Sequence, residues 1–278
     1  MTALSAPAAV VRRLETADLA AVRAMVDAEP FGNAVIAARL DSGRVAEVLA
    51  VGRPGAPTAA CYAGGTVLPV GGDIAAWTVL ADYLGSRHRP CSSIVGAADA
   101  MEVLRPALLS NWGAARRVYP QQPLLALDRP APVLPDPLVR PTRIDELDRY
   151  LPAAAAMFDE ELGIAPLSGP AGDAYRSRLA ALVRTGRVLV RTDAYGEVVF
   201  KAELAVVSRH TCQVQGVWVR PDRRGRGVGT EAMAAVIAYA LRLAPSVSLY
   251  VNDFNLPARR LYNRLGMRQV GILSTVLF

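Results

Sequence analysis

A proline-rich segment near the middle of the chain limits most strongly how the sequence can fold. Residues 129–141 read RPAPVLPDPLVRP, and five prolines in this segment exclude both a helix and a central strand. The segment is therefore predicted to be a semi-rigid linker. It separates a predicted domain at 1–128 from a second at 138–278, which includes the end of the linker, and each part is long enough to form a domain.

The two parts of the chain resemble each other. Residues 11–13 lead to 17–19 and residues 139–141 lead to 145–147, at a constant offset of 128, and each pair predicts a short strand followed by a capped helix. Toward the other end, 108–113 parallels 261–266, and both segments place glycine where a helix ends in a left-handed turn. Two matches in the same order predict an internal duplication.

The composition restricts the class of protein. Hydrophobic residues make up 52% of the 278 residues and charged residues 20%, which supplies enough apolar surface for real cores. No stretch approaches 18 consecutive apolar residues, so we expect no membrane-spanning helix. Residues 1–11 lack the basic start and long apolar run of a secretory leader.

Cysteine and histidine are scarce. The three cysteines, Cys61, Cys91 and Cys212, lie far apart, which predicts buried reduced thiols in a cytosolic protein and neither a disulfide framework nor a metal site. Two histidines, His88 and His210, make a histidine-based triad or metal site improbable.

The net charge is +6, and almost all of the positive charges are arginines, because Lys201 is the only lysine. A basic chain favours an anionic partner, either a nucleic acid or a phosphorylated small molecule. No basic run is interleaved with aromatic residues in the manner of single-strand binding proteins. The arginines cluster in one loop and are otherwise scattered, so we expect no nucleic-acid partner.

The second half shows a clear order of predicted elements, recognised from its hydrophobic periodicity and its turn residues. They are helices at 145–158 and 173–185, strands at 187–192, 197–207 and 211–220, a helix after 229, a strand at 246–251, a helix at 256–265, and strands broken near Gly271 over 267–278. The strands at 197–207 and 211–220 are expected to pair antiparallel.

A loop rich in glycine and arginine lies between a predicted strand and a helix. Residues 221–229 read PDRRGRGVG. Glycine lets the backbone approach a bulky anion, amides at a helix N-terminus point at that anion, and arginine adds charged donors, so the loop is predicted to bind a diphosphate. The GxGxG spacing, without a following Lys-Ser/Thr, excludes a nucleotide P-loop. The alternative is a flexible basic turn.

Residues 214–266 resemble the acetyl-CoA-binding core of the GNAT N-acetyltransferase superfamily. The family pattern Gln/Arg-x-x-Gly-x-Gly/Ala after Val-x-Pro is matched by residues 224–229 after 219–221. The second family pattern, Asn-x-x-Ala-x-x-x-Tyr and then Gly, is matched by residues 255–262 and Gly266. Two motifs in order and at normal separation make the match specific over about 138–278.

The resemblance implies an α/β fold of two tandem GNAT-like domains, each a mixed, mostly antiparallel twisted sheet flanked by helices. The first half resembles the fold only as a degenerate copy. Strand 66–70, glycines 71–72 and helix 73–84 repeat the order strand, glycine turn, helix, but lack the arginines. Leu109 stands where Tyr262 stands in the second half. We therefore expect the first half not to bind acetyl-CoA in the family's manner.

The resemblance implies acetyl-CoA as co-substrate and no metal. Its contacts would come from Val217, Trp218, Val219, Arg224, Gly225, Arg226, Gly227, Val228, Gly229, Thr230 and Asn255. Two of these residues have a simpler interpretation. Asn255 can be a helix cap, and the side chain of Trp218, which alternates with its neighbours, is expected to pack in the core.

Three residues are candidates for proton transfer. Tyr262 matches the family's general acid, which would protonate the leaving thiolate. The general base is open between Glu203, which shares a strand face with Lys201, and Glu161, which with Glu160 follows the first helix. The alternatives are a core-facing helix residue with its hydroxyl at the rim for Tyr262, a solvated strand face or a structural ion pair for Glu203, and a solvated helix end for Glu161.

The resemblance therefore implies a cytoplasmic, acetyl-CoA-dependent N-acetyltransferase that acts on a primary amine of a small molecule or peptide, with neither nucleic acid nor membrane as partner. The alternative is a non-catalytic acyl-CoA-binding sensor or scaffold. The sequence leaves the acceptor and the oligomeric state open.

Overall fold

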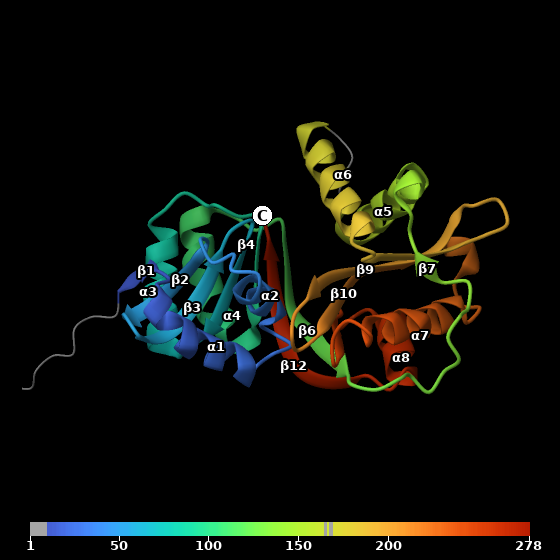
Figure 1. Cartoon of the computed structure of the whole chain (residues 1–278). Coiled ribbons are helices and arrows are strands. Elements are labelled where there is room, and N and C mark those ends of the chain that lie inside the picture. Colours follow the sequence, from blue (N-terminus) through green and yellow to red (C-terminus); the bar gives the residue numbers. More distant parts are fainter. Residues whose placement is uncertain (1–9, 164–165, 167–168) are drawn as a thin grey trace, which may run out of the picture. The chain divides into compact units, whose positions relative to one another are not determined.

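The computed structural model describes residues 10–163, 166 and 169–278, so most of the segment 1–11 lies outside the described residues. The chain forms two compact units (Figure 1). Unit 1 consists of the described part of Met1–Leu124 with Tyr250–Phe254 and Gln269–Phe278; unit 2 consists of the described part of Leu125–Leu249 with Asn255–Arg268.

Unit 1 contains a sheet in the order β1-β2-β3-β4-β5-β12, in which β4 and β5 pair parallel and the other pairs run antiparallel. Its elements are β1 (Val11–Arg13), a 3-10 turn (Thr16–Asp18), α1 (Leu19–Ala28), α2 (Ala34–Asp41), β2 (Val48–Arg53), β3 (Ala56–Ala63), β4 (Thr66–Gly71), α3 (Ile74–Gly85), β5 (Ser93–Ala97), α4 (Ala98–Trp112) and β12 (Arg268–Leu277); β6 (Arg117–Leu127) begins in this unit and ends in unit 2.

The end of the chain belongs with unit 1, not with the predicted domain 138–278. Strand β12 pairs antiparallel with β5 from Leu273 opposite Ala97 to Leu277 opposite Ser93. These main-chain hydrogen bonds join segments far apart in sequence, which no local pattern encodes. Strand β12 also runs unbroken through Gly271, so the predicted break there is wrong.

Alternation along β3 shows how both faces of this sheet are covered. Ala59 and Cys61 are buried in the cluster that includes α3 and α4. Ala60 and Tyr62 are buried in the cluster that includes α1 and α2. Because side chains on a strand alternate between faces, the β3 sequence fits a sheet that is covered on both sides.

Unit 2 contains strands in the order β11-β10-β9-β8-β7, in which β10 and β11 pair parallel and the others antiparallel. Its elements are β7 (Arg140–Pro141), 3-10 turns (Ile144–Glu146 and Pro221–Arg223), α5 (Leu147–Leu162), α6 (Gly169–Arg184), β8 (Val188–Thr192), β9 (Val198–Val207), β10 (Cys212–Val219), α7 (Val228–Ala240), β11 (Val247–Tyr250) and α8 (Leu256–Arg264). The order predicted for the second half is confirmed up to β12.

Helices cover both faces of the unit 2 strands. Figure 1 shows α5 and α6 on one side of β9 and β10, and α7 and α8 on the other. On the first side, Met157, Leu179 and Trp218 are buried in one cluster with residues of β8 and β9. The predicted α/β fold with a mixed, mostly antiparallel sheet flanked by helices is confirmed.

The predicted linker takes part in unit 2. Arg140 and Pro141 form the edge strand β7, which pairs with β8, a position where proline is tolerated because one side needs no donor. Asp136 is buried, with one carboxylate oxygen 3.0 Å from Nη1 of Arg191. The proline-rich segment therefore lies along this unit as ordered chain.

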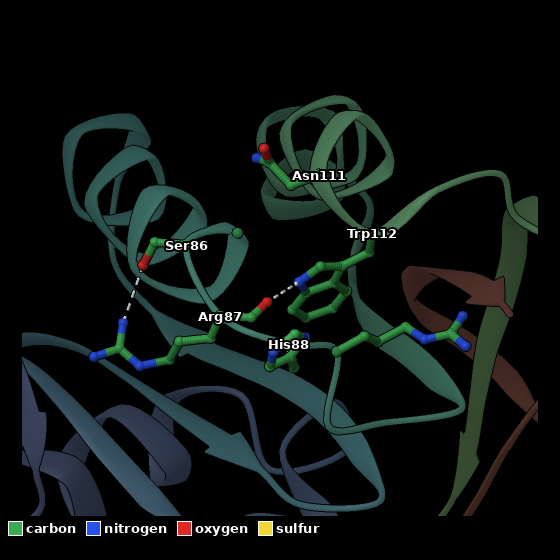
Figure 2. A pocket seen from close by; sticks show the side chains of 7 residues that line it. Ser86, Arg87, His88, Asn111 and Trp112 are labelled. Carbon is green, nitrogen blue, oxygen red and sulfur yellow. Dashed lines mark hydrogen bonds between the residues drawn. The ribbon is translucent and has the colours of Figure 1, made fainter.

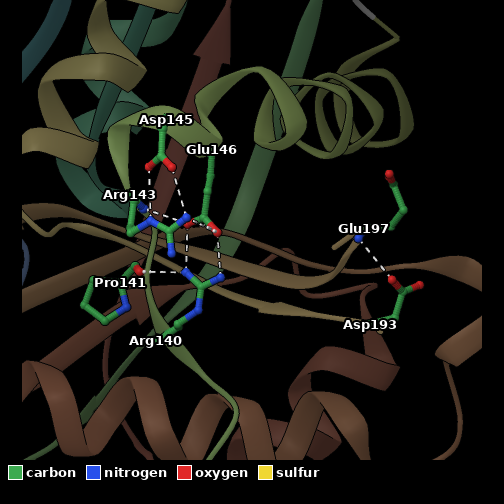
Figure 3. Close-up of polar contacts among 7 residues, drawn as sticks. All are labelled: Arg140, Pro141, Arg143, Asp145, Glu146, Asp193 and Glu197. Atoms are coloured by element: carbon green, nitrogen blue, oxygen red, sulfur yellow. Dashed lines mark hydrogen bonds and ion pairs between the residues drawn. The ribbon is translucent and has the colours of Figure 1, made fainter. Parts of the chain in front are cut away.

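The same ion pair occurs at the start of both halves. Both terminal nitrogens of Arg140 donate to Glu146, at 2.8 and 2.6 Å, and the carboxylate also accepts from the main-chain N–H of Arg143 at 2.9 Å (Figure 3). At positions 128 residues earlier, both terminal nitrogens of Arg12 donate to Asp18 at 2.6 and 2.7 Å. Asp18 likewise accepts from the main-chain N–H of Glu15, three residues earlier, at 2.9 Å. This repeated geometry supports the duplication beyond the level of sequence.

Candidate functional site

The predicted diphosphate loop follows β10 in unit 2 and ends at the start of α7. Gly225 and Gly227 have φ angles of 71° and 83°, which disfavour other residues, and a Cβ on either glycine would meet no atom within 4 Å. Gly227 is the N-cap of α7 and has no side chain with which to cap it. The first N–H groups of α7 therefore have no side-chain cap, and the loop before them has open space at both glycines.

Close packing holds this helix start against the rest of unit 2. A Cβ on Gly229 would lie 3.1 Å from Cδ1 of Leu261 and 3.2 Å from Cγ2 of Val219. Glycine at this position therefore lets α7 approach α8 and the end of β10. Thr230 donates its main-chain N–H to the carbonyl of Gly227 at 2.9 Å, so the amides before it are the ones left for a ligand.

Arg224 and Arg226, two of the three arginines of the loop, have different surroundings. Arg224 donates from Nε to the carbonyl of Val219 at 2.8 Å and from Nη2 to Oε2 of Glu160 at 2.6 Å. Arg226 is exposed, and within the described part of the chain no carboxylate pairs with it. Arg226 therefore supplies an available cation, and Arg224 one that Glu160 already positions.

A β-bulge interrupts the pairing of β9 and β10 just before this loop. Gln215 lies opposite Glu203 and Trp218 opposite Lys201, so Gly216 and Val217 face a single residue of β9. Gly216 has a φ of 59°, and a Cβ there would lie 3.1 Å from Nζ of Lys201. The bulge brings the main chain of β10 against the only lysine of the chain.

The buried face of β9 carries an ion pair at this bulge. Nζ of Lys201 lies 2.9 Å from Oε1 of Glu203, and their side chains are 0% and 1% exposed. Glu203 also accepts from Tyr150 Oη at 2.8 Å and from Arg178 Nη2 at 3.1 Å. The prediction that Lys201 and Glu203 share a strand face is confirmed.

These partners control the protonation of Glu203. Burial acts to raise its pKa, but the charges of Lys201 and Arg178 and the hydrogen bonds of the cluster outweigh that effect and hold the pKa below its usual range. A carboxylate with a lowered pKa and all these donors is a weak proton acceptor. The geometry therefore favours a positioning role for Glu203 over that of general base.

Glu161 differs from Glu203 in the exposure of its side chain and in the direction of its pKa shift. Its side chain retains exposed surface at the last turn of α5. Desolvation by neighbouring atoms raises its pKa, Lys201 lowers it, and Glu160 and Glu203 raise it further, for a net upward shift. A carboxylate with a raised pKa and access to solvent has the properties of a general base.

Tyr262 lies on α8 and is 6% exposed. Burial and the negative charge of Glu161 raise the pKa of its hydroxyl well above the usual value. No described residue hydrogen-bonds with this hydroxyl. All three predicted proton-transfer residues lie in unit 2.

Two predicted cofactor contacts have structural roles as well. Asn255 is the N-cap of α8, and its Oδ1 accepts the N–H of Ala258 at 3.2 Å. The ring of Trp218 is buried against α5, and its Nε1 donates to Oε1 of Glu160 at 3.1 Å. Trp218 can therefore contact a ligand only through its main chain, in contrast to Asn255.

Sequence reasoning missed the residues that surround the ion pair. Tyr150 and Arg178 come from α5 and α6, more than 20 residues before Glu203, and no spacing rule connects them. One signal was available: Gly216 is an isolated glycine inside an apolar strand, which is typical of a bulge. Glu160, which binds both Trp218 and Arg224, could only be placed by the fold.

Unit 1 shows what the corresponding helix start looks like without a diphosphate site. Asp73 is the N-cap of α3, and its Oδ1 accepts the N–H of Ala76 at 2.9 Å. Nε1 of Trp77 donates to the carbonyl of Gly71 at 2.8 Å, and a Cβ on Gly72 would lie 2.8 Å from the same Nε1. A carboxylate and an indole thus take the place that a diphosphate needs.

Unit 1 nevertheless contains two pockets. One of about 670 Å³ is lined by the ends of β4 and β5 and includes Trp77, Glu29 and Asp99. The other, of about 740 Å³, lies between the ends of α3 and α4, where Nε1 of Trp112 donates to the carbonyl of Arg87 at 3.0 Å (Figure 2). Neither pocket contains a predicted site residue.

Over residues 10–163, 166 and 169–278, no group of three or more His, Cys, Asp or Glu side chains is placed to hold a metal ion. Over the same residues, every helix is too short or too polar to cross a bilayer. Cys61, Cys91 and Cys212 are buried free thiols, as predicted.

Two family matches cover separate parts of the chain. Residues 46–150 match a family described as a domain of unknown function (DUF4081), and residues 157–267 match the acetyltransferase (GNAT) family. A search of curated proteins finds no match.

Three solved structures are similar over nearly the whole chain. A GCN5-related N-acetyltransferase from Sphaerobacter thermophilus is 17% identical with a TM-score of 0.61, covering 98% of this chain and 95% of its own. A Drosophila protein is 13% identical with a TM-score of 0.64, covering 97% and 99%. A GNAT-family acetyltransferase from Colwellia psychrerythraea is 11% identical with a TM-score of 0.59, covering 96% and 99%. At these identities the likeness shows the fold alone.

The sequence match and the geometry agree on the same region. The segment 157–267 contains the diphosphate loop, the bulge, Glu161, Glu203 and Tyr262. The segment at residues 157–267 therefore matches the GNAT acetyltransferase family, and residues 46–150 match a different family.

Proposed function

We propose that unit 2 transfers an acetyl group from acetyl-CoA to a primary amine. The observation that carries this proposal is the start of α7, where a glycine N-cap leaves the first amides uncapped beneath open space. These amides, the helix dipole and the exposed Arg226 together suit a diphosphate. Acetyl-CoA joins such a diphosphate to an activated thioester, which supplies the acyl group.

The bulge in β10 suits the reacting end of the donor. A bulge leaves one residue outside the ladder, so a main-chain N–H among Gly216 to Val219 is available to a carbonyl oxygen. An N–H that is fixed in advance stabilises the negative charge that develops on that oxygen. In the proposed reaction, the amine nitrogen bonds to the acyl carbon and the carbon–sulfur bond breaks.

Glu161 and Tyr262 divide the proton transfers between them. Glu161 accepts the proton that the attacking amine loses, and the Tyr262 hydroxyl donates to the departing sulfur. Burial and the negative charge of Glu161 both raise the pKa of the Tyr262 hydroxyl, which therefore carries its proton when the thiolate leaves.

The ion pair under the bulge positions this machinery. The buried ion pair of Lys201 and Glu203 gives little or no net stability compared with apolar residues. The presence of this ion pair therefore fits a functional requirement. Because both side chains lie against Gly216, they fix the conformation of the bulge. In this proposal Lys201 and Glu203 are positioning residues.

The direct test is release of free thiol from acetyl-CoA in the presence of a panel of amines. We expect amine-dependent thiol release, and calorimetry should show one acetyl-CoA per chain because Asp73 and Trp77 fill the corresponding place in unit 1. Binding without thiol release for any amine would favour the sensor or scaffold alternative. Two binding sites per chain would contradict the contrast between α3 and α7.

The pH dependence tests the assignment of the base. Glu161 must be ionised to accept a proton, so kcat/KM should rise with pH through its raised pKa. In Glu161→Gln this rise should vanish, and activity should be regained only as the amine itself deprotonates at higher pH. Asp159→Asn, two residues earlier on α5, is the control and should keep the wild-type profile. An unchanged profile in Glu161→Gln would assign the proton to another acceptor.

A further inference from the structure

A compact group of polar side chains lies beside the bulge, on the face of β9 covered by α5 and α6. We call Tyr150, Tyr175, Arg178, Lys201 and Glu203 the acceptor-side cluster. Glu203 is its centre and receives Tyr150 Oη at 2.8 Å, Lys201 Nζ at 2.9 Å and Arg178 Nη2 at 3.1 Å. The cluster is next to the main chain proposed to hold the reacting carbonyl.

Two side chains in this cluster, Tyr175 and Arg178, have hydrogen-bonding capacity that the described residues leave unused. The Tyr175 hydroxyl is buried, yet it forms no hydrogen bond with any described residue. The Arg178 side chain is 43% exposed, and its contact with Glu203 uses only one of its nitrogens. Its guanidinium carbon lies 5.6 Å from the centre of the Tyr175 ring. A buried hydroxyl without a partner is costly, so both groups favour a ligand that accepts hydrogen bonds.

The charges of the cluster indicate the sign of that ligand. Lys201 and Arg178 supply two positive charges against the single negative charge of Glu203. A planar guanidinium with free donors suits a carboxylate. Glu161 supplies a separate negative charge on α5, about one helical turn after Phe158, whose ring packs against Tyr175. The site therefore offers the carboxylate of Glu161 to an amine, and the positive charges of Lys201 and Arg178 to a carboxylate.

We propose that the acceptor is an amino acid or a related small amino carboxylate, whose carboxylate is bound by Arg178 and Tyr175 while its amine faces Glu161. This inference rests on the proposed acetyl transfer and adds the class of acceptor. Phe158 packs edge-on against Tyr175, with ring centroids 5.0 Å apart, and so holds the tyrosine in place for this contact.

The test compares free amino acids with their C-terminal amides, which lack the carboxylate, and each kcat/KM is expressed per concentration of unprotonated amine because amidation also lowers the pKa of the α-amine. Leucine, phenylalanine and lysine are assayed beside leucinamide, phenylalaninamide and lysinamide, with a dipeptide as a further arm. For the wild type we expect kcat/KM to be about 10- to 100-fold higher for each acid than for its amide, the range of a charge-assisted contact. Preference for the dipeptide over both would assign the carboxylate contact to a peptide terminus and overturn the small-molecule assignment.

Variants show whether Arg178 and Tyr175 cause that preference. Arg178→Met and Tyr175→Phe should each lower the acid-to-amide ratio, and Tyr175→Phe removes only a hydroxyl, so the fold is not at risk. Arg176→Met, on the same helix and paired with the exposed Asp148, should leave the ratio unchanged. A ratio that survives in both Arg178→Met and Tyr175→Phe would overturn the assignment of these residues.

Calorimetric titration of each acid and amide into the CoA-loaded protein separates this inference from the proposed function. Equal affinities and equal turnover of acids and amides overturn the inference and leave acetyl transfer standing. Absence of turnover with every amine overturns the proposed function, and the ratio of affinities then still decides whether the site recognises a carboxylate.

Discussion

Replacing Gly227 by glutamate is expected to abolish acetyl-CoA binding. The glycine is the N-cap of α7, so a glutamate there would put a carboxylate over the amides proposed to hold the diphosphate. It would copy the arrangement in unit 1, where Asp73 caps α3. Losing even two charge-assisted contacts, with repulsion added, should raise the dissociation constant by at least about 100-fold, measured by calorimetry.

Two controls separate the charge from the backbone strain. Gly227→Ala carries the same unfavourable positive φ without the charge, so any loss of affinity beyond that of alanine belongs to the carboxylate. Gly113→Glu places the same side chain at another glycine of positive φ with open space, in unit 1, and should bind acetyl-CoA normally. A folded Gly227→Glu protein with wild-type affinity would show that the diphosphate does not bind at α7.

Replacing Tyr262 by phenylalanine is expected to lower kcat by about 10- to 10⁴-fold with little change in acetyl-CoA affinity, the usual scale for a lost general acid. The ring is buried and is retained, so packing should survive. The loss should shrink with acyl donors whose leaving thiol is more acidic, because such thiolates need less help from a proton donor. Single-turnover kinetics beside calorimetry measures both quantities.

The control for this variant is Tyr195→Phe, which removes a hydroxyl at a tyrosine that is 88% exposed and should leave turnover unchanged. Leu109, on α4 of unit 1, occupies the place that corresponds to Tyr262, and Leu109→Ala should reduce stability alone. Wild-type turnover in Tyr262→Phe, with chemistry shown to limit the rate, would remove this residue from the mechanism.

The features that sequence predicts well here are local ones. The loop at 221–229 needs glycines for positive φ angles, and a strand before and a helix after it are visible in the apolar pattern. The alternation of side chains along β9 depends only on neighbouring residues in the sequence. Lys201 and Glu203 could therefore be placed on one face of the strand from the sequence. The capping role of Asn255 likewise depends on one turn of helix.

The features that sequence misses depend on distant pairing. Strand β12 joins unit 1 through hydrogen bonds to β5, which begins about 180 residues earlier and has no matching local signal. Arg178 reaches Glu203 only because α6 packs on β9. The choice between Glu161 and Glu203 as base depends on burial and on the charges nearby, neither of which a strand pattern contains.

The most direct test of the account is transfer of isotopically labelled acetyl from acetyl-CoA to an amine, followed by mass spectrometry of the amine under single-turnover conditions. The wild-type protein should yield labelled amide in amounts equal to the thiol released. Gly227→Glu should yield none, and Tyr262→Phe should yield the same product slowly. Label that stays on acetyl-CoA with every amine, while the wild-type protein binds acetyl-CoA, would contradict acetyl transfer by unit 2.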